Sequence, residues 1–318
     1  MLEILAGMLR TAAPILLAAM GGVVFEKSGV FTIAHEGIML FGAFFGVLGV
    51  YLTASPLMGV AFALTAGAVC GLLYIWLTER LSANATIVSI GINTLAIGAT
   101  TYMMKMIFGD AGTVGNPRII GLPRISIPLF DRVPFLDKVL NNHTALVYVS
   151  LLLVAALHFL LFHTHLGISL RAVGEKPEAA AAAGIPVYRY RLAASVFAGM
   201  LCGLAGVHLD ETAKVLLMSV ALGEIGGELR AYRKNVSGAG FFAYTAVVFG
   251  HANPFAAALA SFVFGLAEVV TFRVQNLNLP GPLVLTIPYL VTLAVLILRN
   301  LRLKKPAVHK PNPAATNN

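Results

Sequence analysis

Apolar runs of about 20 residues recur along most of this sequence, and they restrict the possible folds more than any other feature. An α-helix needs about 20 apolar residues to cross a hydrocarbon core of roughly 30 Å. Only 11% of the 318 residues are charged, whereas typical soluble domains have about 25%. The sequence therefore predicts an all-α polytopic membrane protein.

Nine such runs can be assigned, to within one or two, and we expect about 8–10 transmembrane helices. The runs are residues 4–25, 37–54, 56–78, 86–108, 144–162, 192–209, 238–250, 254–272 and 283–301. The run at 238–250 has only 13 residues, so we expect a broken or re-entrant helix surrounded by protein there. Residues 1–302 are predicted to form a single transmembrane domain, followed by a disordered cytoplasmic tail at 303–318.

The orientation follows from the C-terminal sequence "RNLRLKKPAVHKPNPAATNN", which is basic and then polar. Basic termini are typically cytoplasmic. Counting spans back from this tail places 163–191 in the cytoplasm and the loop 109–143 outside. Tyr74 and the lone tryptophan then fall at the cytoplasmic interface, as in an aromatic belt. The basic segment 230–234, "RAYRK", would change part of this topology if 211–229 enters the membrane.

Two segments share a spacing that predicts an internal repeat. "SPLMGVAFALTAG" (55–67) and "NPFAAALASFVFG" (253–265) each have a proline followed 11 residues later by a glycine. Five spans separate them, so the copies would run in opposite directions. Inverted repeats of this kind are typical of transporters, although two apolar helices can also share the spacing by chance.

The segment 169–191, "SLRAVGEKPEAAAAAGIPVYRYR", is too polar to cross a bilayer. Pro177 suits a first helical position and Gly184 a helix stop, which predicts a helix of about seven residues. Isolated helices of that length are unstable in water. The segment therefore either binds a soluble partner at the cytoplasmic face or rests on its own protein as a connecting loop.

Residues 167–206, "GISLRAVGEKPEAAAAAGIPVYRYRLAASVFAGMLCGLAG", resemble the cytoplasmic coupling segment of ABC importer permeases of the nucleoside/simple-sugar class, which are related to branched-chain amino acid and ribose permeases. "SGVFTIAHEGIMLFGAF" (28–44) is similar to that family's motif after the first span. "SGAGFFAYTAVVFGHANPFAAALASFVFGLAE" (237–268) resembles its late helix pair. The likeness covers most of the chain in the same order.

The resemblance implies a permease subunit that translocates nucleosides, or a related simple sugar, across the bacterial cytoplasmic (inner) membrane. It implies three partners: a cytoplasmic ABC ATPase that binds ATP and Mg²⁺, a second permease subunit that completes a heterodimeric pore, and an extracytoplasmic substrate-binding protein. It also implies which residues dock on the ATPase. These are Arg171, Gly174, Glu175, Pro177, Ala180, Ala183 and Gly184.

The chain departs from the family pattern at several positions. The family usually has asparagine where this chain has Thr32, and His35 is unusual in the same motif. An arginine expected in the later glycine motif is Ala239 here, and the stretch between Gly206 and Gly238 is longer than expected. These changes bear on the identity of the cargo more than on the class of transporter.

Polar residues inside predicted spans are candidates for the substrate pathway. Ser89, Asn93 and Thr100 share one helical face with Thr86. They either line a pathway for a hydroxyl-rich solute or make hydrogen bonds between helices. Asn93 is the strongest pathway candidate because its carboxamide both donates and accepts. Glu36 either interacts with the N-terminal dipole of its helix or contributes to a gate.

Other functions are less well supported by the residues present. No G-x-x-x-x-G-K-[ST] loop occurs, so ATP hydrolysis would belong to another chain, and we expect neither an enzyme nor a directly bound cofactor. His158, His163 and His165 lack a nearby cysteine or carboxylate, so no metal site is expected. The net charge of +8 lies in loops and tail, which favours contact with membrane lipid and not nucleic acid. An ion-coupled secondary transporter and an integral membrane enzyme are the alternatives.

Overall fold

The computed structural model describes residues 2–108, 124–126, 139–141, 143–207 and 238–275, together with residues 286, 290, 293 and 297. The chain divides into two compact units, 1–269 and 270–318. The helices between residues 2 and 269 form the first unit.

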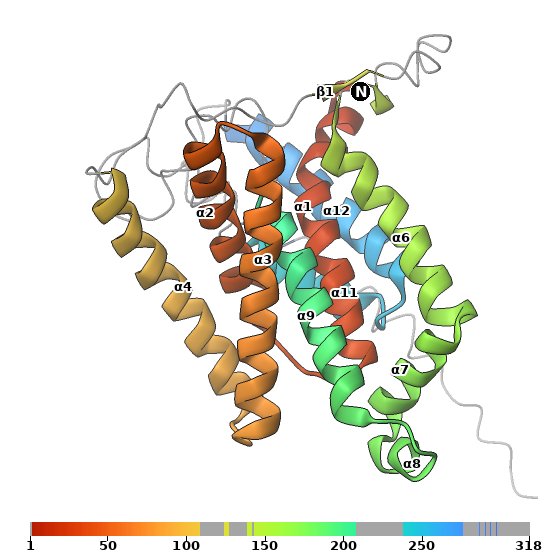
Figure 1. Ribbon diagram of the computed structural model, residues 1–318. Coiled ribbons are helices and arrows are strands. Elements are labelled where there is room, and N and C mark those ends of the chain that lie inside the picture. Colours follow the sequence, from red (N-terminus) through yellow and green to blue (C-terminus); the bar gives the residue numbers. More distant parts are fainter. Residues whose placement is uncertain are drawn as a thin grey trace, which may run out of the picture. The chain divides into compact units, whose positions relative to one another are not determined.

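The described residues are almost entirely helical (Figure 1), which confirms the all-α prediction. The helices are α1 (Leu2–Lys27), α2 (His35–Thr53), α3 (Pro56–Ile75) with a π-helical turn (Trp76–Arg80), α4 (Ala85–Phe108), α6 (Ala145–His163), α7 (His165–Glu175), α8 (Pro177–Ala182), α9 (Val187–Gly206), α11 (Ala239–Phe249) and α12 (Pro254–Gln275). Two short strands, β1 (Arg124–Ile125) and β2 (His143–Thr144), pair antiparallel.

Eight of the nine predicted spans correspond to α1, α2, α3, α4, α6, α9, α11 and α12. Within the described residues, six helices are long and apolar enough to cross a membrane: α1, α2, α3 with its π-helical turn, α4, α6 and α12. Helix α11 has 11 residues, which agrees with the expected short element. The ninth predicted span, the tail, the segment 211–229 and most of the loop 109–143 lie outside the described residues.

Helix α1 is the central element of the first unit. It contacts α6, α9 and α11, and its middle part is fully buried, with Ile15, Leu16, Leu17 and Met20 at its core. Helix α3 packs on α9 through backbone contact, because a Cβ on Gly67 would lie 2.1 Å from the carbonyl oxygen of Gly199. Small residues therefore set the spacing of these helices, as is usual in membrane bundles.

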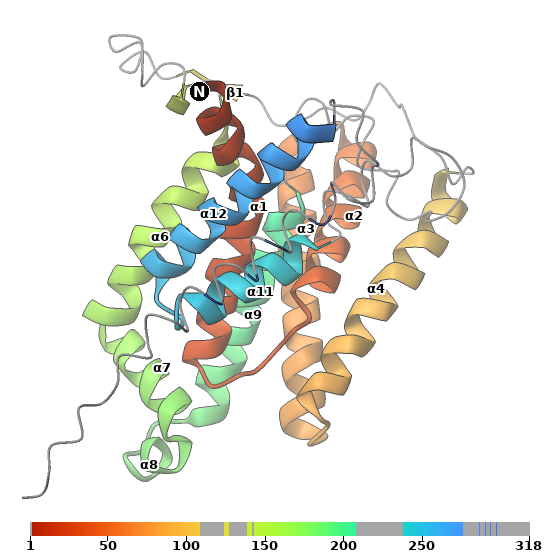
Figure 2. The same ribbon diagram turned by 180° about the vertical axis from the view of Figure 1, so that it is seen from behind.

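Two helix pairs carry the predicted repeat. The turn between α2 and α3 contains Ala54 in a left-handed conformation, and the turn between α11 and α12 contains Ala252 in the same one. Figures 1 and 2 show the first turn at the end of the unit where α1 begins, whereas the second points toward the end that carries α7 and α8. The pairs thus run in opposite directions, as an inverted repeat requires.

The glycines of the repeat occupy equivalent places. Gly67 of α3 lies against α9, and Gly265 of α12 lies against α1, where an added Cβ would come within 2.6 Å of the Cβ of Ala12. Each glycine therefore lets the second helix of its pair approach the backbone of a central helix. This matching contact, together with the matching turns, agrees with the proline–glycine spacing noted in the sequence.

Candidate functional site

The first turns of α2 and α11 meet inside the first unit, and we call this place the helix-end junction. It comprises residues 32–37 at the start of α2, residues 238–240 at the start of α11, and Ser89 and Asn93 on α4. Helix α2 begins only at His35, after the non-helical segment 28–34. Its first turn lies against α11 so closely that a Cβ on Gly240 would come 2.4 Å from the amide nitrogen of Glu36.

Glu36 belongs to the N-terminal ends of both helices. It lies in the first turn of α2, and its Oε1 accepts a hydrogen bond from the amide of Gly238, 3.3 Å away, just before α11 begins. A carboxylate is stabilised near a helix N-terminus by the partial positive charge there. The position of Glu36 agrees with the expected interaction with the N-terminal dipole of α2. The same side chain also joins α2 to the start of α11, so a movement of either helix changes this contact.

Asn93 of α4 caps α2 from another part of the chain. Its Oδ1 accepts from the amide of Gly37 at 2.8 Å, and its Nδ2 donates to the carbonyl of Ile33 at 3.1 Å. The first N–H groups of a helix have no partner within the helix, and Ala34 at the capping position offers no side-chain acceptor. Both sides of the Asn93 carboxamide therefore bind the entry of α2.

Ser89 holds the same segment one turn earlier on α4. Its hydroxyl accepts from the amide of Ile33 at 3.1 Å and lies 3.4 Å from the Thr32 hydroxyl. Thr100 is buried but is not part of the junction, and its hydroxyl donates to Ala96 within α4 at 2.6 Å. The structure thus brings Ser89 and Asn93 together with the motif at 32–37, whereas their role in the substrate pathway stays a prediction.

His35 is also part of the helix-end junction. The sequence showed only that a histidine is unusual at this position of the motif and did not predict its place in the site. The imidazole is 2% exposed, and both ring nitrogens lack a hydrogen-bond partner. Phe25 and Tyr244 flank it, each with a ring centroid 6.0 Å away. The departure from the family motif was the only signal in the sequence.

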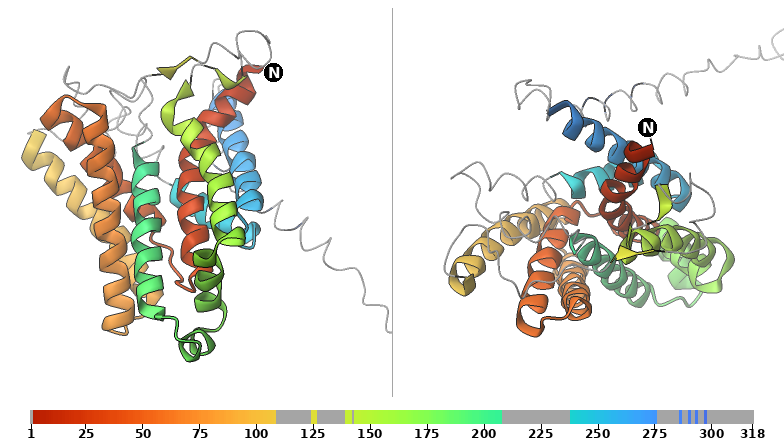
Figure 3. Two further views of the ribbon diagram at one scale, coloured as in Figure 1. Left: turned by 45° about the vertical axis from the view of Figure 1, so that its right-hand side comes forward. Right: turned by 90° about the horizontal axis from the view of Figure 1, so that it is seen from above.

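The second functional region is the end of the unit that carries α7 and α8, here called the α8 end (Figure 3). The short helix expected in the polar segment is present as α8, six residues beginning with Pro177. Gly184 ends it with φ +80°, and the amide of Ile185 donates to the carbonyl of Ala180 at 3.0 Å. Ala180 is buried, whereas Glu178 and Ala183 are exposed.

Helix α7 connects α8 to the segment that leads into the junction. A Cβ on Gly174 would lie 2.3 Å from the carbonyl oxygen of Lys27, and Gly29, at φ +74°, approaches Gly174 within the same crossing. Val173 is fully buried beside it. Helix α7 therefore packs directly, backbone to backbone, on residues 27–29, where α1 ends and the non-helical entry of α2 begins.

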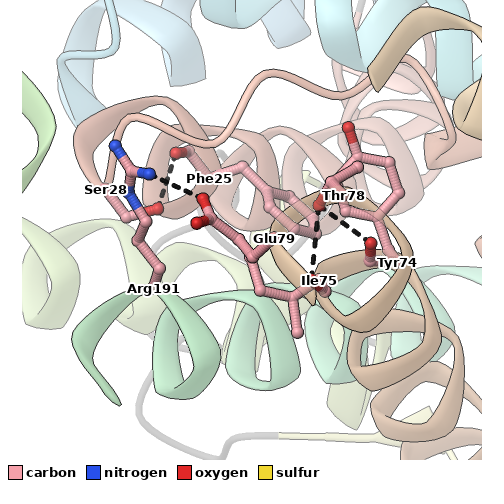
Figure 4. A network of polar contacts seen from close by, with 7 residues as sticks. All are labelled: Phe25, Ser28, Tyr74, Ile75, Thr78, Glu79 and Arg191. Carbon is pink, nitrogen blue, oxygen red and sulfur yellow. Dashed lines mark hydrogen bonds and ion pairs between the residues drawn. The ribbon is translucent and has the colours of Figure 1, made fainter. Parts of the chain in front are cut away.

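Charged residues fasten the end of α3 to the start of α9 (Figure 4). Arg191 pairs with Glu79 at 2.6 Å, and the Arg80 guanidinium lies 4.8 Å from the ring centroid of Tyr188. Of the two residues expected in an aromatic belt, Trp76 is exposed at the end of α3, whereas Tyr74 does not face outward as a belt residue would. Its ring is fully buried, and its hydroxyl donates to the carbonyl of Phe31.

A cavity of about 380 Å³ opens at the α8 end between α1, α7 and α11. Its lining residues are Glu26, Lys27, Arg171, Gly174, Glu175, Val247, Val248, His251 and Ala252. Arg171 lies over the ring of Phe162, with 4.8 Å between the guanidinium carbon and the ring centroid. Three of the predicted coupling residues, Arg171, Gly174 and Glu175, therefore share this cavity, whereas Pro177, Ala180, Ala183 and Gly184 belong to α8 and its end.

Comparisons with known proteins cover nearly the whole chain. A family model described as "Branched-chain amino acid transport system / permease component" matches residues 4–298. The chain is 34% identical over 298 residues to the guanosine ABC transporter permease protein NupQ of Bacillus subtilis, covering 90% of this chain and 88% of the relative.

The names of two further relatives mention nucleosides and glucose. The nucleoside ABC transporter permease protein NupC of Lactococcus lactis is 29% identical over 306 residues, 93% of this chain and 91% of the relative. A putative glucose ABC transporter permease protein of Haloferax volcanii is 29% identical over 311 residues, 90% of this chain and 88% of the relative. No solved structure matches.

Proposed function

The chain belongs to the family of branched-chain amino acid transport system permease components and is the multi-pass permease subunit of an ABC importer in the cell membrane; on this premise we propose that it imports nucleosides. The observation that carries the proposal is the 34% identity, over nine-tenths of the chain, to a relative named for guanosine. The second relative, named for nucleosides, points to the same cargo. A simple sugar is the alternative, because a third relative is named for glucose.

ATP hydrolysis is proposed to act through α7 and α8. Membership of the family implies an ATPase and a substrate-binding protein as partners. The α8 helix is too short to be stable by itself, and it presents Glu178, Ala181 and Ala182 to the outside. Docking of the ATPase on this surface would move α7, and the contact of Gly174 with Lys27 would carry the movement to the entry of α2.

The α8 end is proposed to face the cytoplasm. Most of the described basic residues gather there, at the ends of α1 and α3, in and after α7 and at the start of α9: Lys27, Arg80, Arg171, Lys176, Arg189 and Arg191. Cytoplasmic ends of membrane proteins are enriched in lysine and arginine. We further propose that the membrane is the bacterial cytoplasmic membrane, that the C-terminus is cytoplasmic and that ATP and Mg²⁺ bind to the partner ATPase.

A second permease subunit is proposed to complete the pore. Helix α4 offers a surface for this contact, because it packs on α2 with one face and exposes large apolar residues such as Ile87, Leu95 and Ile97 on the other, where a second subunit would replace lipid. The prediction is a complex with one copy of this chain and one of a related permease. Mass measurement of the detergent-solubilised transporter, purified through the ATPase, would show two copies of this chain if the pore were homodimeric.

Reconstituted transport tests the cargo and the coupling. Proteoliposomes with the complete transporter should take up labelled guanosine in the presence of ATP and the binding protein, and excess ribose or glucose should not compete. Uptake of glucose but not of any nucleoside would refute the proposed cargo.

Two variants test the coupling at α8. Glu175→Arg, and deletion of 177–184, should abolish the stimulation of ATP hydrolysis by cargo. The control is Glu3→Arg, the same charge reversal at the start of α1, which should leave stimulation intact. Full stimulation in both α8 variants would refute the coupling role.

A further inference from the structure

The burial of the His35 imidazole destabilises the conformation described here. Its imidazole has one N–H donor and one nitrogen acceptor when neutral, and neither ring nitrogen has a partner. A buried polar group without a hydrogen bond destabilises the conformation that holds it. A leucine or phenylalanine would fill the same space without this cost, so the imidazole calls for an explanation in another state of the protein.

The surroundings of His35 suit a planar ligand. Phe25 of α1 meets the imidazole edge to face, and Tyr244 of α11 lies on another side of it. Phe31 of the entry segment in turn meets Tyr244, with 6.2 Å between ring centroids. Aromatic side chains of this kind bind heterocyclic bases by stacking. Three rings and one imidazole therefore come together from α1, α2, α11 and the segment between the first two.

The side chain of Val247 links His35 to the cavity at the α8 end, because it lies near both. A Cβ on Gly22 would lie 2.7 Å from both the Nε2 of His35 and a methyl carbon of Val247, so these two side chains are neighbours over α1. Val247 also lines the cavity. Displacement of α11, which has only 11 residues, would move Val247 aside and extend the cavity to the imidazole.

We propose that His35 is the specificity-determining residue of the cargo site, and that it hydrogen-bonds the base of the nucleoside when α11 moves away from α1. The inference rests on the proposed function and adds that the protein recognises the base of the nucleoside. The cargo would be selected by the polar edge of its base, between the rings of Phe25 and Tyr244, and not by its sugar alone. His35 stands where the family motif is unusual, as a residue that sets selectivity would.

The test combines substitutions in the protein with substitutions in the cargo. His35→Leu removes both nitrogens, and His35→Gln keeps a donor and an acceptor. Unlabelled guanosine and purine riboside, whose base lacks the polar substituents, compete for uptake of labelled guanosine. In the unsubstituted protein guanosine should compete about tenfold better or more, since one hydrogen bond to the base is at stake.

His35→Leu should raise the KM for guanosine by about tenfold and bring the two competitors close to equality. His35→Gln should recover part of the preference. The matched control is His158→Leu on α6, where a histidine also has a buried nitrogen without a partner but lies beside Phe162 and Phe255, away from the junction. It should keep both the KM and the preference for guanosine.

An unchanged KM and an unchanged preference in His35→Leu would overturn the inference. Loss of thermal stability in that variant without a change in preference would also overturn it, because a packing role predicts that pattern. Failure of the unsubstituted transporter to import any nucleoside would instead refute the proposed function, and the inference with it.

A second measurement does not depend on the folding of His35 variants. Val247 is only 2% exposed in this conformation, so a cysteine at this position should react with a maleimide only when α11 moves away from α1, and guanosine should change the rate of this reaction at least twofold. The two native cysteines, Cys70 and Cys202, are buried and give a low background. A labelling rate that is the same with and without guanosine would contradict a cargo site behind Val247.

Discussion

Asn93→Ala is the most informative single perturbation of the helix-end junction. The change removes the carboxamide that accepts from Gly37 and donates to Ile33. The Gly37 amide belongs to the first turn of α2 and has no partner within the helix. The variant therefore leaves a donor at the start of α2 and a carbonyl in the entry segment without their hydrogen bonds.

The expected cost follows from these two contacts. Side-chain hydrogen bonds between membrane helices contribute about 0.6 kcal/mol each on average, or about 1.2 kcal/mol for two. A buried donor left unpaired costs about 1–3 kcal/mol, and Asn93 is only partly buried. We expect a loss of about 1–3 kcal/mol in the free energy of unfolding. Since 1 kcal/mol corresponds to about 2–4 °C in domains of 150–250 residues, Tm should fall by about 2–12 °C.

The two native cysteines can report thermal unfolding in this measurement. Both cysteines are buried, in α3 and α9, so a fluorogenic maleimide reacts only as the protein unfolds on heating. The control is Thr94→Ala, the next residue on α4, whose exposed hydroxyl bonds only to the carbonyl of Ile90. Equal melting temperatures for Asn93→Ala and Thr94→Ala would refute the capping role. Normal uptake by Asn93→Ala, with an unchanged KM, would remove Asn93 from the substrate pathway.

Three further predictions use the same melt and related measurements. Glu79→Ala and Arg191→Ala should show a coupling energy of about 0.5–1 kcal/mol in a double-mutant cycle, because both partners are partly exposed; strictly additive effects would contradict the pair. Gly67→Ala should lower Tm strongly, because its Cβ would lie 2.1 Å from a carbonyl oxygen of α9, whereas Gly98→Ala on α4 meets no atom within 4 Å and should not. A methyl group at Gly184 would meet no atom within 4 Å, but φ there is +80°, which costs an L-residue about 1 kcal/mol. In Gly184→Ala the amide hydrogens of α8 should therefore exchange faster by the corresponding factor, with little change in the Tm of the whole protein.

Local sequence signals predicted the helices and several of their ends well. The proline and glycine around the alanine run predicted α8 to within about one residue, because capping depends on neighbours in the chain. The proline–glycine spacing of the repeat also predicted two helix pairs, and the structure orients them oppositely. Tyr74 shows where such reasoning fails. A tyrosine near the end of an apolar run is typical of a membrane interface. In the structure, however, Tyr74 is buried, and the carbonyl of Phe31 in the segment before α2 accepts a hydrogen bond from its hydroxyl.

Apolar run length and helix caps act over a few residues, so the sequence alone predicts that the chain crosses a membrane many times, where most helices lie, and which polar segment lies outside them. Which polar residues meet depends on contacts between segments that are far apart in the chain. Glu36 bonds to Gly238 across 202 positions of sequence, and the start of α2 takes its cap from α4 because its own capping position is an alanine. Contacts between distant segments depend on how closely the backbones pack, and that is set by helices that meet only when the whole unit has folded.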